Sequence, residues 1–78
     1  MPAYLARITV SPVPDDGERF GMADALGADA DHEMSDGGVI FHVLGEAPDL
    51  SAATAAGRQH AAEVLDGYTF EVEVHELP

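Results

Sequence analysis

The dipeptide of Asp36 and Gly37 constrains the fold more than any other feature of this sequence. It joins a mostly polar segment, residues 31–35, to an apolar segment, residues 38–44. Asp-Gly is typical of a two-residue type I′ turn between antiparallel strands, because both positions of that turn need positive φ. The middle of the chain is therefore predicted to be a β-hairpin. Counting outward from the turn gives three facing pairs: Ser35 with Gly38, Glu33 with Ile40, and Asp31 with His42.

Two more strands are predicted at residues 3–10 and 68–75, where apolar and polar side chains alternate. Pro12 and Pro14 end the first of these strands, because proline cannot continue a ladder of backbone hydrogen bonds. The same alternation predicts which side chains face the core. They are Tyr4, Ile8, Val10, Val39, Phe41, Val43, Phe70, Val72 and Val74.

A helix is predicted after the first strand. Asp15 is a typical N-cap, and Glu18 follows it at the spacing of a capping box. Gly27 is a typical C-terminal stop. Phe20, Ala23 and Leu26 follow at helical spacing and are expected to face the core.

A second helix is predicted to open at Ala47, Pro48 and Asp49 and to run to about Asp66, with Gly67 as its stop. Its apolar stripe consists mostly of small residues, which would let the helix lie close to the sheet: Leu50, Ala53, Gly57, Ala61 and Val64. His60 borders this stripe and is expected to be a half-buried histidine at the edge of the core.

The order of these elements is strand, helix, strand, strand, helix, strand, which is the split βαβ pattern. This βαββαβ order resembles the ferredoxin-like plait, an α+β fold. Its four-stranded antiparallel sheet has the order 4-1-3-2, and right-handed crossovers put both helices on one face. The alternative is a three-stranded βαβαβ layer in which residues 30–35 form a loop; the hairpin signal favours four strands. Residues 1–78 are expected to form a single domain, and the plait by itself carries no function.

The charge of the chain excludes several classes of partner. There are fifteen Asp and Glu residues against three Arg and no Lys, so the formal net charge is −12. Arg7, Arg19 and Arg58 are too few and too scattered to neutralise nucleic-acid phosphates or anionic lipid headgroups, so neither nucleic acid nor a membrane is an expected partner. The acidity is consistent with solubility, with a GC-rich genome or high-salt adaptation, with attraction to a basic partner, or with mimicry of nucleic-acid charge.

The N-terminal residues lack the basic and apolar regions of a signal peptide, and no apolar run is long enough to span a membrane. A cytoplasmic location is therefore expected. There is no Cys for a disulfide or a thiolate site, and no phosphate-binding loop, dinucleotide fingerprint or nucleophile elbow. No cofactor or metal is expected.

The face of the predicted sheet that the helices leave open is the candidate interaction surface. Leu5, Ile40 and Leu44 are large apolar side chains on a face that alternation assigns to solvent, and a contiguous apolar patch there would mark a contact site. Arg7 is expected to pair across the strands with Glu71 or Glu73 in a surface ion pair of little energetic weight. The predicted interface residues are Leu5, Arg7, Ile40, His42, Leu44, Glu71, Glu73 and His75.

Three functional hypotheses follow. The leading one is a non-enzymatic protein–protein interaction module that self-associates or docks a partner through the open sheet face. The second is a small-molecule-binding or enzymatic plait domain that uses His42, His75 and Glu71, with Asp31 nearby, as an acid/base or metal-binding group. The third is an acidic decoy of a nucleic-acid-binding protein.

Overall fold

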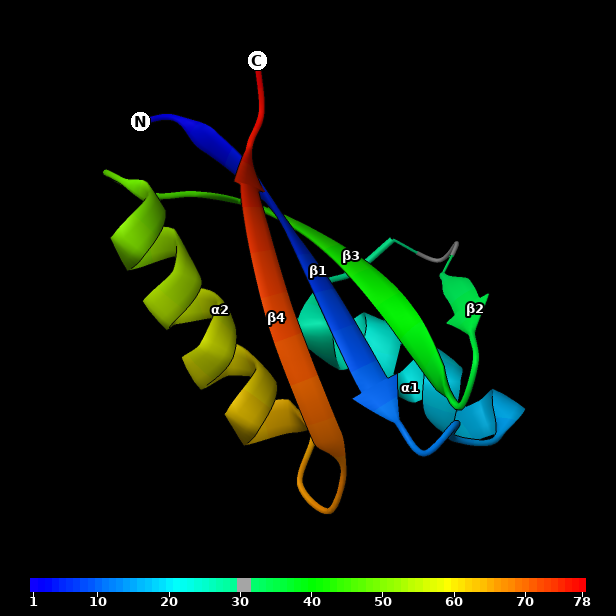
Figure 1. Ribbon diagram of the computed structural model, residues 1–78. Helices are drawn as coiled ribbons and strands as arrows, with labels where there is room; N and C mark the ends of the chain where they lie inside the picture. The colour runs from blue at the N-terminus through cyan, green and yellow to red at the C-terminus, as the bar shows by residue number, and fades with distance from the viewer. Residues whose placement is uncertain (30–31) are drawn as a thin grey trace.

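The computed structural model describes residues 1–29 and 32–78, and this part of the chain forms one four-stranded sheet covered on one face by two helices (Figure 1). The elements follow one another as β1 (Ala3–Ser11), α1 (Asp16–Leu26), β2 (Glu33–Ser35), β3 (Gly38–Glu46), α2 (Leu50–Val64) and β4 (Thr69–Glu76). The strand order is β2-β3-β1-β4, with every neighbouring pair antiparallel. This order is the predicted 4-1-3-2 read from the other edge, so the ferredoxin-like plait is confirmed and the three-stranded alternative is wrong.

The hairpin of β2 and β3 has the predicted register but not the predicted turn. Ser35 pairs with Gly38 and Glu33 with Ile40. The third predicted pair, Asp31 with His42, involves a residue outside the described part of the chain. Gly37 has a φ of 76°, whereas no residue other than glycine has positive φ among those described, so Asp36 does not adopt the conformation that a type I′ turn needs. The register is the same because a two-residue connection sets it.

Both helices begin at aspartate caps, and the cap of α1 is the predicted one. The Asp15 side chain accepts a hydrogen bond of 2.8 Å from the backbone N–H of Glu18, and this bond lowers the pKa of the Asp15 carboxyl. Asp49 accepts a bond of 2.7 Å from Ala52 N–H. Gly27 ends α1 in the left-handed region with a φ of 72°.

The end of α2 differs slightly from the prediction. The helix stops at Val64, two residues before Asp66, and Leu65 N–H still donates to the carbonyl of Ala61 at 2.8 Å. Gly67 lies in the turn that follows, with a φ of 87°. The stop therefore comes earlier because Leu65 leaves the helical conformation to enter the core, where it is 2% exposed.

The core lies between the helices and the half of the sheet nearest the β2–β3 turn. Its buried apolar residues are Ile8, Val10, Val39 and Phe41 from the sheet, Ala23 and Leu26 from α1, and Ala61 and Leu65 from α2. Val43, Phe70 and Val72 from the predicted inward set pack against this cluster as partly buried residues. Alternation therefore identified the buried face of every long strand.

Phe20 was predicted to face the core, and this prediction is wrong: its side chain is 61% exposed. Successive helical residues are about 100° apart, so residues spaced by three spread over a wide arc of the helix. The buried side of α1 is centred on Ala23 and Leu26, and Phe20 falls at its margin. The Phe20 ring instead contacts His32 edge-on, with ring centroids 5.9 Å apart.

Candidate functional site

The face of the sheet opposite the helices, called the open face below, carries all eight residues of the predicted interface. Their positions follow from β1, which pairs with β3 on one side and with β4 on the other. Three rows of side chains cross the open face. The first row is His75, Leu5 and Leu44; the second is Glu73, Arg7 and His42; the third is Glu71, Thr9, Ile40 and Glu33.

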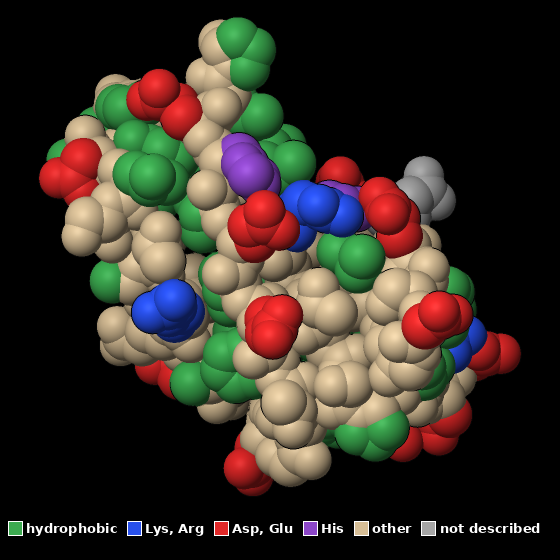
Figure 2. All heavy atoms as spheres, viewed as in Figure 1, with side chains coloured by type: hydrophobic (Ala, Val, Ile, Leu, Met, Phe, Trp, Pro, Cys, Tyr) green, Lys and Arg blue, Asp and Glu red, His purple; other side chains and the backbone are tan. Residues whose placement is uncertain are grey.

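The residues of the second row make charged and polar contacts with one another and with the neighbouring rows. Arg7 Nη1 lies 3.9 Å from Glu73 Oε2, so the predicted pairing with a glutamate of the last strand is present. His75 Nε2 lies 3.1 Å from the other oxygen of Glu73, and His42 Nε2 lies 3.4 Å from Glu33 Oε1. Figure 2 shows this row as neighbouring blue, purple and red side chains across the face. The glutamate side chains of these pairs are exposed to solvent, so each pair contributes about 0–1 kcal/mol to the free energy of unfolding.

The three apolar residues of the open face do not form one patch. Leu5 and Leu44 are direct partners across β1 and β3, and Leu44 is 61% exposed. Ile40 lies in the third row, separated from both leucines by the row of Arg7 and His42. The apolar contact surface is therefore the pair of Leu5 and Leu44, called the leucine pair below.

The alternative acid/base group is not gathered at one point. His75, His42 and Glu71 lie in the first, second and third rows, and each histidine contacts a different glutamate. Asp31 lies outside the described residues. In residues 1–29 and 32–78, no group of three or more His, Asp or Glu side chains is placed to hold a metal ion.

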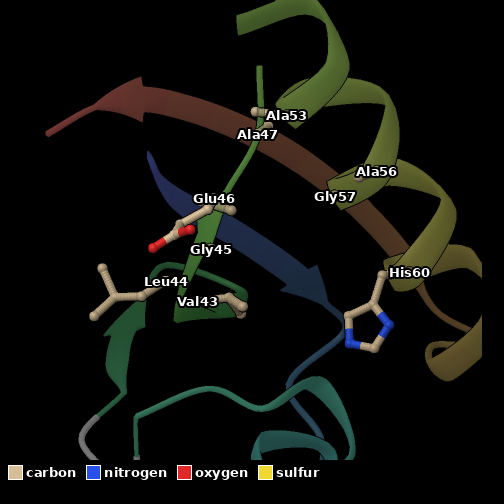
Figure 3. Close-up of a pocket in the computed structure, with 10 residues that line it drawn as sticks. Val43, Leu44, Gly45, Glu46, Ala47, Ala53, Ala56, Gly57 and His60 are labelled. Atoms are coloured by element: carbon tan, nitrogen blue, oxygen red, sulfur yellow. The ribbon is translucent and has the colours of Figure 1, made fainter. Parts of the chain in front are cut away.

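The helix-covered face contains a cavity of about 220 Å³ between α2 and the last residues of β3 (Figure 3). Most of its wall is apolar and made of small residues. The walls include Ala6, Val43, Gly45, Ala53, Gly57 and His60. In Figure 3 the Leu44 and Glu46 side chains point to the other side of β3, so these two residues border the cavity with their backbone.

The cavity has two structural causes. α1 has only 11 residues, and its buried residues Ala23 and Leu26 contact the core at the other end of the sheet, so α1 leaves this end uncovered. α2 covers it with Ala and Gly and lies close to β4, since a Cβ at Gly57 would be 3.3 Å from Val72 Cγ1. Gly57 of the predicted stripe thus lies close to β4 and leaves space beside β3, whereas Leu50, at the start of the stripe, is exposed.

His60 connects the two helices next to this cavity. Its Nε2 lies 3.0 Å from the carbonyl oxygen of Leu26, the last residue of α1. A carbonyl only accepts hydrogen bonds, so Nε2 donates and fixes the orientation of the ring. His60 is half-buried, as expected for a histidine at the core edge.

Negative charge surrounds the same end of the molecule. Tyr4 pairs with Gly45 on β3 and with Glu76 on β4. Burial, together with the negative charges of Glu76 and Asp49, raises the pKa of the Tyr4 hydroxyl above its ordinary value. The potential at this end therefore favours cations.

Sequence reasoning did not find the cavity. The small residues of α2 were visible in the sequence, but small residues are equally compatible with close packing and with empty space. The combination that signals a cavity is the small stripe together with an α1 too short to reach the end of β3. Whether α1 reaches the end of β3 depends on where α1 lies on the sheet, and no local sequence pattern predicts that position.

Comparison of the chain with protein-family models, with curated proteins and with solved structures finds no match. In the part of the chain that the structure describes, neither helix is long and apolar enough to cross a membrane.

Proposed function

We propose that the protein is a non-enzymatic interaction module that docks a protein partner on the open face of its sheet. The observation that supports this most directly is the leucine pair. Leu44 is 61% exposed beside Leu5 on the face of the sheet opposite the two helices. Docking would remove this apolar surface from water, at about 25 cal/mol for each Å² buried.

The charge of the chain favours a basic partner over a second copy. Each copy has a formal net charge of −12, so self-association brings like charges together. The open face itself holds Glu33, Glu46, Glu71 and Glu73 against Arg7 alone, apart from histidines. A partner with Lys or Arg around a small apolar centre complements this arrangement and would be attracted electrostatically.

The proposal is tested by placing charge on the leucine pair. The double variant Leu5→Asp with Leu44→Asp should abolish partner capture from an extract of the native host, compared quantitatively with wild type. The matched control is Met34→Asp with Leu50→Asp, which adds the same charge at two exposed apolar residues away from the open face. Circular dichroism should be unchanged for both variants.

The salt dependence of binding separates the possible partners. Binding to a basic protein should weaken as salt rises, because salt screens attraction between unlike charges. Self-association of an acidic chain should instead strengthen, and light scattering would then show a dimer at high salt. Capture that survives in the leucine-pair variant but falls steeply with salt would overturn docking on the open face and favour the acidic decoy.

A further inference from the structure

One edge of the sheet is open next to the cavity. Within residues 1–29 and 32–78, β2 pairs with the first three residues of β3, ending at Ile40. Beyond that point the backbone N–H of Asp29 donates to the carbonyl of His42 at 3.0 Å, which shows that the polar groups of His42 point outward from the sheet. Backbone groups of alternate residues point the same way, so those of Leu44 and Glu46 also point outward. Within residues 1–29 and 32–78, the outward N–H and C=O groups of Leu44 and Glu46 form no hydrogen bond with another backbone group.

This free edge of β3 differs from the other edge of the sheet. β4 carries Glu71, Glu73, His75 and Glu76, and charged side chains of this kind discourage pairing with another strand. The free edge of β3 has Leu44 and Gly45 at its centre and no proline or charge before Glu46. It therefore lacks the usual protection against an added strand.

The cavity lies on the side of this edge where alternate side chains of an added strand would enter. Val43 and Gly45 belong to the helix-covered face and line the cavity. In a strand paired to β3, the residues opposite them would point to the same face. The volume of about 220 Å³ exceeds the roughly 150 Å³ of an engineered apolar cavity that holds benzene, so a phenyl or branched aliphatic side chain fits.

We propose that the free edge of β3 at residues 44–46, together with the cavity under α2, binds an extended segment of a basic protein. The segment adds to the sheet as a further strand, inserts an apolar side chain into the cavity, and carries Lys or Arg on either side of it. Strand addition of this kind draws affinity from main-chain hydrogen bonds and specificity from the pockets for alternate side chains. The inference rests on one part of the proposed function, that the chain is an interaction module for a basic protein, and it specifies the form of that partner and a binding site other than the leucine pair.

Charge decides between a basic segment and a second copy of the chain. Asp29, Glu33 and Glu46 lie along the β3 edge, and Asp49 and Glu76 lie at the cavity end. Two copies joined edge to edge would bring these carboxylates together. A segment with Lys or Arg beside its apolar residue would neutralise them.

The test uses a displayed library of random ten-residue peptides, selected on the immobilised full-length protein. Enriched peptides should contain an aromatic or branched aliphatic residue flanked by Lys or Arg. A synthetic copy of the strongest peptide is then titrated against variants. On binding, the backbone amides of Leu44 and Glu46 should become protected from hydrogen exchange, because they donate to the added strand.

Two pairs of variants separate the cavity from the edge. Ala53→Leu fills the cavity and should weaken peptide binding at least about tenfold, whereas Ala55→Leu adds the same side chain on an exposed part of α2 and should change it little. Glu46→Pro removes an outward N–H without breaking the ladder to β1, and should also weaken binding at least about tenfold. Glu46→Gln removes only the charge and should have a smaller effect.

The outcomes distinguish this inference from the proposed docking on the open face. Peptides that bind Ala53→Leu and Glu46→Pro as well as wild type, or a library that yields no enrichment, would overturn the inference. If these two variants lose peptide binding and the Leu5→Asp variant binds the peptide as well as wild type, the result would support binding at the β3 edge and overturn docking on the leucine pair. A dimer that Glu46→Pro dissociates would show that a second copy, not a basic segment, occupies the edge.

Discussion

The two ends of the helix-covered face are built from the same strands but packed very differently. At the end near the β2–β3 turn, the closed end, Val10, Val39 and Phe41 are 0% exposed. At the end near the chain termini, the open end, Tyr4 is buried, but Val43 is only half-buried and Gly45 is exposed. Alternation along β1 and β3 is equally regular at both ends, so the strand pattern alone does not decide how tightly a region packs.

The difference comes from what the helices bring to each end. The closed end receives Leu26 and Leu65, whereas the open end faces Ala53 and Gly57 and is not reached by α1. Large side chains exclude water and stabilise the fold, while small ones leave room for a side chain from elsewhere. We therefore expect the closed end to supply most of the stability, and our proposal places binding at the open end.

Truncation of one aromatic residue at the closed end should have the largest effect. Phe41→Ala should cost about 3–5 kcal/mol of unfolding free energy, a large share of the roughly 4–12 kcal/mol typical for a chain of this length. Val43→Ala at the open end should cost less than about 1.5 kcal/mol, since Val43 is already partly solvated. Urea unfolding followed by circular dichroism measures both, and equal costs would remove the distinction between the two ends.

Larger side chains on α2 also test the difference in packing between the closed end and the open end. Ala61 is 0% exposed at the closed end, so Ala61→Leu should overpack the core and cost roughly 3 kcal/mol. Ala53→Leu at the open end enters the cavity and should change stability by less than about 1 kcal/mol. Thermal unfolding of the two variants distinguishes them; a large loss in Ala53→Leu would show that the cavity cannot accept a leucine side chain.

Two glycines of β3 extend the comparison to the backbone. A Cβ at Gly38 would lie 2.7 Å from the carbonyl oxygen of Val10, so Gly38→Ala should displace the strand and cost about 1–2 kcal/mol. A Cβ at Gly45 meets no atom within 4 Å, and Gly45→Ala should be neutral or stabilise by about 0.5 kcal/mol through the unfolded state. Unfolding midpoints in urea give both values, and destabilisation by Gly45→Ala would indicate that the open end is more constrained than its exposure suggests.

The fold was predictable because its determinants are local. Alternation identified β1 and β4, the Asp36 and Gly37 pair set the hairpin register, and the aspartate caps located the helix starts. The pairing of Leu5 with Leu44 rather than with Ile40 was not predictable, because it depends on the register of β1 against β3, which no turn fixes. Phe20 and the cavity depend on the rotation and reach of α1, which are tertiary properties.

The smallest expected effect is the pH dependence of the cap on α1, the helix that covers only the closed end. The hydrogen bond from Glu18 N–H holds the pKa of Asp15 below its ordinary value of 3.8. The folded state therefore binds this proton less readily than the unfolded state. The stabilisation is present above the ordinary pKa and is lost as the pH falls through the lowered one.

Asp15→Asn provides the matched comparison, because the amide oxygen can accept the same bond but does not titrate. Urea midpoints measured from neutral pH to about pH 3 should fall more steeply for wild type than for Asp15→Asn. The difference should be small, since Asp15 is exposed and a single cap is involved. Parallel curves would show that the charge of Asp15 contributes nothing to α1. Asp15→Asn should leave the affinity for the bound peptide unchanged, because α1 does not reach the open end where the added strand is proposed to lie.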